Sequence, residues 1–153
     1  MDKEITIEAL NDLVEINNDR IVGYETATKE IDDSDLHLLF NKFILTSEKC
    51  AAVLRIEVAK LSGETETGTK NTGKLHRLWM DFKAAFKENN KLSILESCEF
   101  GDNIAVKTYT DTLDDNLQNL DPELQKIIME QQNDIKKEYA EIIHLIALEE
   151  AKK

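Results

Sequence analysis

The stretch from Ile7 to Ile31, IEALNDLVEINNDRIVGYETATKEI, decides the fold class of this chain. Its apolar side chains recur every three or four residues, or at multiples of that spacing, and they are Ile7, Leu10, Val14, Ile21, Tyr24 and Ile31. A long stretch with a single apolar stripe at helical spacing is typical of an amphipathic helix that packs on a core. We therefore predict a helix over residues 5–31.

Three further long helices follow from similar signals. Residues 32–34, Asp-Asp-Ser, interrupt the first stripe and offer an N-cap for a second helix, which stops at Gly63. A third helix is predicted from Lys91 to Asp115. Residues 121–123, Asp-Pro-Glu, combine an N-cap, a proline at the first helical position and an acid in the first turn, so they start the last helix. No segment shows the two-residue period of a strand.

The connections between these helices predict the topology. Residues 64–73 are rich in Thr and Gly and read as a loop, and residues 75–86 form a shorter amphipathic piece. Short first and last turns with a long middle crossover are typical of a ferritin-like, up-down four-helix bundle. We predict an all-α single domain over residues 1–153, with a short extra helix between helices two and three.

Composition narrows the function classes. The chain has 31 acidic and 19 basic residues, a formal charge of −12 and a pI near 4.7. The negative electrostatic potential that this charge produces repels phosphate backbones, so nucleic acid is not an expected partner. No apolar run is long enough to cross a bilayer, and no signal peptide is visible, so we expect no membrane partner and a cytoplasmic location. The two cysteines, Cys50 and Cys98, are expected to be reduced and buried.

Polar side chains interrupt the apolar stripes near the middle of every long helix. Burying an unpaired polar group costs about 1–3 kcal/mol, so several in one layer are expected to bond to one another or to bind something. The predicted buried polar layer consists of Asn17, Ser47, Glu99 and Gln131, with Cys50, Asp102 and Asp134 at neighbouring stripe positions.

The segment from Leu10 to Tyr24 resembles the first helix of bacterioferritins. In that family, glutamates from two helices and two Glu-x-x-His motifs bind a pair of metal ions. On this resemblance, Asn17 replaces the first glutamate, and Ser47 and Cys50 replace the first Glu-x-x-His motif. Glu99 keeps the third-helix glutamate. The second motif falls on Gln131 and Asp134, with Glu138 as a rival position.

A closer resemblance is to an uncharacterised ferritin-like family of bacteria, a domain of unknown function. It is carried by Leu10–Tyr24, by the helix around Arg55–Gly63 and above all by Leu75–Lys83, LHRLWMDFK. This resemblance implies the fold and a bacterial, stress-associated setting. It implies no established activity.

Three readings of the polar layer remain open. A di-iron site needs about four carboxylates and two histidines, and no histidine falls at a predicted ligand position, which disfavours it. The layer could instead be a hydrogen-bonded core in which Asn17, Ser47 and Gln131 donate to Glu99. Between these lies a single-metal site that uses the Cys50 thiolate and Glu99, for zinc or a cuprous ion, with Asp102, Asp134 or Glu138 as further weak candidates.

Two function classes follow from these readings. The first is a non-enzymatic bundle that acts by association with itself or with an unidentified protein partner, and a homodimer is among its expected forms. The alternative is a metal-binding redox protein with an unconventional site around Glu99. The sequence contains no nucleophile elbow, phosphate loop or catalytic triad spacing, so we predict no catalytic or cofactor-binding residue. His76, on the crossover, is expected to be a partly exposed surface histidine.

Overall fold

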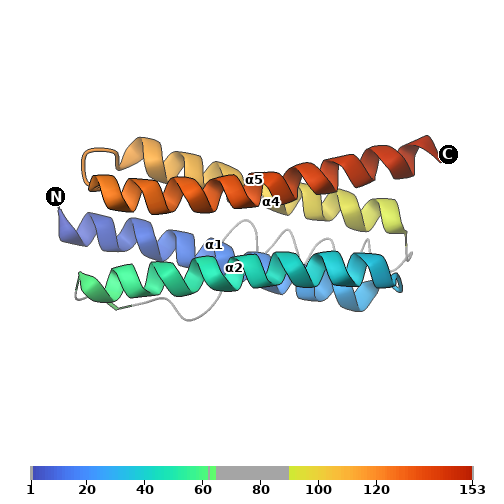
Figure 1. Ribbon diagram of the computed structural model, residues 1–153, viewed down its shortest axis with the longest axis horizontal. Coiled ribbons are helices and arrows are strands. Elements are labelled where there is room, and N and C mark those ends of the chain that lie inside the picture. Colours follow the sequence, from blue (N-terminus) through green and yellow to red (C-terminus); the bar gives the residue numbers. More distant parts are fainter. Residues whose placement is uncertain (1, 62, 65–89, 153) are drawn as a thin grey trace.

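Four long helices are seen in the computed structural model, which describes residues 2–61, 63–64 and 90–152. They are α1 (Lys3–Glu30), α2 (Ser34–Lys60), α4 (Lys91–Asp115) and α5 (Pro122–Ala151). The helices lie lengthwise beside one another, and the two chain ends lie at opposite ends of the molecule (Figure 1). The described residues contain no strand, so the predicted all-α bundle class is confirmed.

Each helix starts where a side-chain oxygen can accept hydrogen bonds from the first free backbone N–H groups. Asp33 caps α2 by accepting from the Leu36 N–H at 3.0 Å, and Asp121 caps α5 by accepting from the Leu124 N–H at 2.8 Å. Asp2 and Asn90 cap α1 and α4 in the same way. Such caps satisfy donors that have no partner inside the helix. The local start signals therefore predicted the helix boundaries to within a few residues.

The packing of the four helices is uneven. The contacts are closest between α1 and α2 and between α4 and α5, intermediate between α1 and α4, and sparse between α2 and α5. The fully buried apolar side chains come from all four helices and include Leu13, Tyr24, Phe40, Phe43, Leu54, Leu95, Tyr109, Ile128, Ile135 and Ile142. One continuous core therefore runs the length of the bundle.

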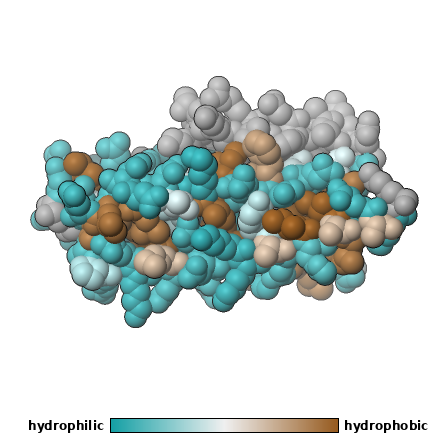
Figure 2. All heavy atoms as spheres, turned by 90° about the horizontal axis from the view of Figure 1, so that it is seen from above, coloured by the Kyte–Doolittle hydropathy of each residue, from teal (hydrophilic) through white to brown (hydrophobic). Residues whose placement is uncertain are grey.

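The surface mixes hydrophilic side chains with scattered apolar ones. Figure 2 shows hydrophobic patches among hydrophilic side chains on the side seen from above the view of Figure 1. Phe100, Met129 and Ile143 are among the large apolar side chains that are between 43% and 52% exposed. Within the described ranges, no helix is long and apolar enough to cross a membrane.

The structure corrects one inward position of the first helix. The sequence pattern assigned Ile21 to the buried stripe, but Ile21 is half-buried and its neighbour Arg20 is 1% exposed. Both positions are compatible with a 3.6-residue period, and Arg20 takes the inward one because buried acceptors surround it. The predicted extra helix, residues 75–86, and His76 lie outside the described residues.

Candidate functional site

The guanidinium of Arg20 lies at the centre of the bundle and bonds to the other three helices. Its Nε donates to Asp102 Oδ1 at 2.8 Å, and its Nη2 donates to Glu138 Oε1 at 2.9 Å and to Asp102 Oδ2 at 3.4 Å. Its Nη1 donates to Ser47 Oγ at 3.0 Å and to the Phe43 backbone oxygen at 3.2 Å. These five bonds match the five N–H groups that a guanidinium carries.

The two carboxylates that face Arg20 have further donors of their own. Asp102 is fully buried, and its Oδ2 also accepts the Tyr24 hydroxyl at 2.7 Å. Glu138 is 6% exposed, and its Oε2 accepts the Thr46 hydroxyl at 2.6 Å. Every carboxylate oxygen in this cluster therefore has a hydrogen-bond donor, as buried charges require. We call Arg20, Tyr24, Ser47, Asp102 and Glu138 the central ion-pair network.

Burial and charge shift the pKa values of the groups in and around this network. Burial opposes ionisation of Arg20, but Asp102, Tyr24 and Glu138 outweigh it and hold the pKa of the guanidinium above its ordinary value. Burial, followed by the Asp102 charge, raises the pKa of the Tyr24 hydroxyl and of the Cys98 thiol well above their usual values. Both groups therefore keep their protons at neutral pH.

A second, neutral layer lies beside the network. Asn17 Nδ2 donates to the Leu13 backbone oxygen and to the Tyr109 hydroxyl, both at 2.8 Å. The Tyr109 hydroxyl donates to Gln131 Oε1 at 2.8 Å, and Gln131 Nε2 donates to the Cys50 backbone oxygen at 3.2 Å. Asn17 Oδ1 is buried and has no hydrogen-bond partner among the described residues, which costs about 1–3 kcal/mol.

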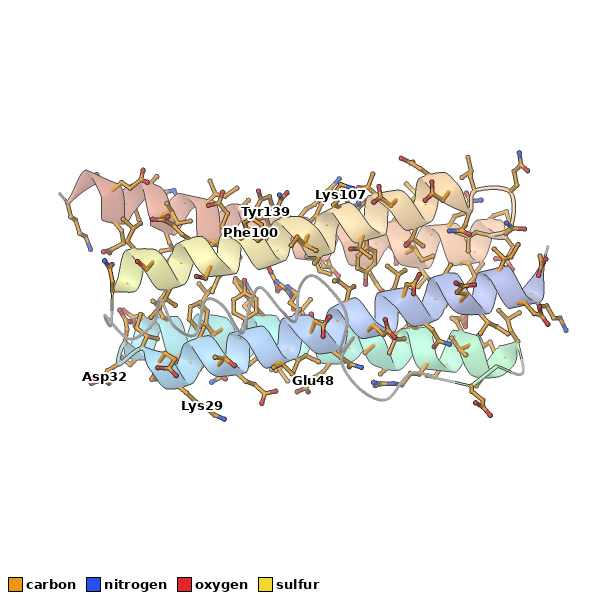
Figure 3. The ribbon with its side chains drawn as sticks, turned by 180° about the vertical axis from the view of Figure 1, so that it is seen from behind. Lys29, Asp32, Glu48, Phe100, Lys107 and Tyr139 are labelled. Carbon is orange, nitrogen blue, oxygen red and sulfur yellow. The ribbon has the colours of Figure 1, made fainter. Side chains whose placement is uncertain are left out.

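The residues of the predicted polar layer do not all meet. Asn17, Ser47 and Gln131 are buried, but their bonds run to Tyr109, Arg20 and the backbone. Glu99 is half-buried and influences Tyr139, whose pKa is raised first by burial and then by the Glu99 charge. Figure 3 labels Tyr139, together with Phe100, which follows Glu99 in the chain. The carboxylates at the centre are therefore Asp102 and Glu138.

The weaker metal-ligand candidates are also spread out. Cys50 is buried beside the neutral layer, Asp102 and Glu138 bind Arg20, and Asp134 is exposed. Within the part of the chain that the structure describes, no group of three or more His, Cys, Asp and Glu side chains is placed to hold a metal ion.

Sequence reasoning missed Arg20, the residue that organises the site. A signal was present, because Arg20 stands three residues after Asn17 and four before Tyr24, at helical spacing on the same face. The predicted polar layer did not include Tyr109 either, although its hydroxyl links Asn17 to Gln131. An arginine in line with buried acceptors, in a chain with acids at inward positions of two other helices, is the pattern that predicts a buried ion pair.

Comparison with known families identifies the chain. The family model described as a domain of unknown function, DUF2383, matches residues 5–115. The chain belongs to this family. The match includes Arg20, Ser47 and Asp102 and ends at the last residue of α4, before Glu138 on α5. A comparison with curated proteins finds no match. Membership in this family therefore brings no activity with it.

The Glu138 carboxyl predicts a measurable pH dependence of stability. Burial raises its pKa, against the opposing effects of Arg20 and Thr46. A folded-state pKa above the unfolded value of about 4.3 gives stability that is present at low pH and lost as the pH rises through the folded pKa. The stability difference between the wild type and Glu138→Gln is therefore expected to fall as the pH rises, in urea unfolding between pH 4 and 7.5.

A variant whose stability difference from the wild type should change with pH in the opposite direction provides the control. Lys152, and then Lys91, lower the pKa of Glu149. Glu149 therefore contributes stability that is present above the unfolded pKa and is lost as the pH falls through the folded pKa. The difference between the wild type and Glu149→Gln should therefore rise with pH. Equal slopes for the two variants would contradict the assignment of the shift to burial at Glu138.

Proposed function

We propose that this protein is a non-enzymatic helical bundle that acts by association with itself or with a protein partner. The observation that carries this proposal is the complete pairing of the central ion-pair network. All five N–H groups of Arg20 have acceptors, and both carboxylates that face it have donors. A general base or a metal ligand must exchange its present partner for a substrate or a cation, whereas these carboxylates face a guanidinium that is part of the chain and is buried with them.

The thiols support the same proposal. Burial raises the pKa of Cys50 to about 11 and places that of Cys98 well above its ordinary value. Nucleophilic and metal-binding cysteines are thiolates whose pKa is lowered by a neighbouring positive charge or by a metal. Here both thiols stay protonated at neutral pH. Protonated, unpaired thiols fit the cytoplasmic location that is part of this proposal. The proposal also includes the stress-associated setting that the resemblance to a bacterial family implies.

Metal analysis tests the proposal against its alternative, a redox metal site around Glu99. We expect protein expressed in medium supplemented with iron, zinc and copper to hold much less than one metal ion per chain. Its melting temperature should not change when metal is added, because the central carboxylates are already bound to Arg20. Stoichiometric metal that is lost in Glu99→Ala but kept in Glu96→Ala, an exposed neighbour, would favour the alternative.

Association itself is tested by sedimentation equilibrium of the pure protein and by affinity capture from cells with the tagged chain. We expect either a concentration-dependent dimer or a stoichiometric protein partner. A strict monomer at millimolar concentration that also captures no stoichiometric partner would refute the proposal.

A further inference from the structure

The α2–α5 face is the loosely packed side of the bundle. It contains two surface pockets, of about 570 Å³ and 320 Å³, which are both lined by these two helices and one of which also includes Lys91. Among the lining residues are Leu39, Lys49, Val53, Ile127, Glu130, Asp134 and Leu145. Pockets with apolar walls and charged edges are typical of surfaces that bind another molecule.

Contacts across this face set the register of the two helices. Lys42 Nζ lies 3.3 Å from Glu141 Oε1, and Thr46 donates to Glu138. The helices run antiparallel, so a step of seven residues forward on α2 and seven back on α5 leads from Lys42 and Glu141 to Lys49 and Asp134. Both of the latter residues line the smaller pocket. Lys42 and Lys49 of α2 therefore each lie at the same height along the bundle as an acidic residue of α5.

Opposite charges face each other across the part of this face that contains the smaller pocket. The sequence of α2 has four basic and three acidic residues, whereas that of α5 has three basic and seven acidic ones. Lys49 and Asp134 are exposed, and no salt bridge within the described residues includes either. At the smaller pocket the α2 edge is thus basic, through Lys49, and the α5 edge is acidic, through Glu130 and Asp134, with Val53 and Ile127 also in the lining. The larger pocket is mixed, with Asp35 on the α2 side and Lys137 beside Glu141 on the α5 side.

We propose that a second copy of this chain binds the α2–α5 face through a two-fold axis that runs parallel to the helices. Rotation about such an axis leaves the height of each residue along the bundle unchanged, and it places α2 of one copy opposite α5 of the other. Lys42 then faces Glu141 of the second copy, and Lys49 faces its Asp134. This inference rests on the proposed function, because it assigns the surface and the partner of self-association.

The other simple two-fold arrangement is unfavourable. An axis in the plane of the face but perpendicular to the helices places α2 opposite α2, so Lys42 and Lys49 meet lysines while Glu130 and Asp134 meet acids. Opposed like charges across an interface cost several kcal/mol. The charge pattern therefore selects the axis parallel to the helices.

The size of the face is sufficient for a stable dimer. A helix of 27 residues such as α2 is about 40 Å long, and a face two helices wide is about 20 Å across. Each copy can therefore bury roughly 800 Å², which is the usual contribution of one partner to a specific interface.

Mixing two charge-reversed variants tests this arrangement. Lys49→Glu and Asp134→Lys each place two like-charge pairs in the homodimer, and we expect each to weaken dimerisation about 100-fold or more in sedimentation equilibrium. An equimolar mixture should regain the dimer, because one interface pair is wild type and the other is reversed but still complementary. Pairs within each chain stay mismatched, so recovery reports contacts between copies alone.

Lys107→Glu is the matched control, since Lys107 is 73% exposed on α4 and outside this face. Its dimerisation should equal that of the wild type, and thermal melting should show all three variants folded. A wild-type dimer that neither Lys49→Glu nor Asp134→Lys weakens would overturn this surface while leaving the proposed function intact. A wild-type monomer that captures a different protein would also overturn it. Weakened variants whose mixture does not regain the dimer would refute the two-fold pairing.

Discussion

Replacing Arg20 with leucine is expected to lower the free energy of unfolding by about 3–5 kcal/mol, which is a large fraction of the stability of an ordinary domain. Arg20 is 1% exposed and neutralises Asp102 and Glu138, which are themselves buried. Leucine removes the positive charge and leaves two carboxylates without it, in an interior that solvates them poorly. Urea unfolding at pH 7, followed by far-ultraviolet circular dichroism, measures the loss.

Two comparisons show whether the loss comes from uncompensated charge. Lys107→Leu removes an exposed cation from α4 (Figure 3), where a pair with Asp111 is worth about 0.3–0.5 kcal/mol. It should leave stability nearly unchanged. A triple variant, Arg20→Met with Asp102→Leu and Glu138→Leu, removes all three charges and should recover most of the loss, since apolar replacements of buried ion pairs are often neutral or stabilising. A triple variant less stable than Arg20→Leu would contradict this explanation.

Replacing Asp102 with asparagine is expected to cost about 3 kcal/mol or more, although the side chain keeps its size. The amide has only one acceptor atom, whereas Asp102 accepts from Nε and Nη2 of Arg20 and from the Tyr24 hydroxyl. The NH₂ group must therefore face a donor, and Arg20 retains only Glu138 as a charged partner. Equilibrium unfolding of Asp102→Asn, Arg20→Leu and the double variant measures the energy by which the two residues are coupled.

The coupling is expected to be at least about 1 kcal/mol, so the double variant should lose clearly less than the two single losses added together. The variant Tyr24→Phe distinguishes the contribution of the tyrosine hydroxyl to stability from that of the charge on Asp102. It removes one hydrogen bond to a charged group, worth about 1.5–3 kcal/mol. Strictly additive losses for Arg20 and Asp102 would mean that the two residues act independently, in conflict with the 2.8 Å bond between them.

These two predictions also bear on function. In the structure a covalently attached cation, Arg20, lies between carboxylates from two other helices, and Ser47 and Thr46 of α2 complete the bonding. A metal ion at this position would have to displace the guanidinium and leave it buried without its partners, at a cost of several kcal/mol. The side chains that stabilise the bundle are thus the ones that oppose metal binding at its centre.

Local sequence determined the helices of this protein. The caps at Asp33 and Asp121 and the proline at the first position of α5 act over one turn, so they can be read from neighbouring residues. The apolar period likewise predicted the buried face of α1 that carries Leu10, Val14 and Tyr24. The all-α class followed from these signals, and burial of Asn17, Ser47 and Gln131 followed from their places on the stripes.

Only the tertiary structure decided which polar side chains bond to one another. A helical period is broad enough to admit either Arg20 or Ile21, and either Glu99 or Asp102, on the inward side. The choice depends on the azimuth of each helix and on the register between helices that are far apart in the chain. Arg20 and Glu138 are 118 residues apart, and a charge is stable in the interior only where another element brings its partner.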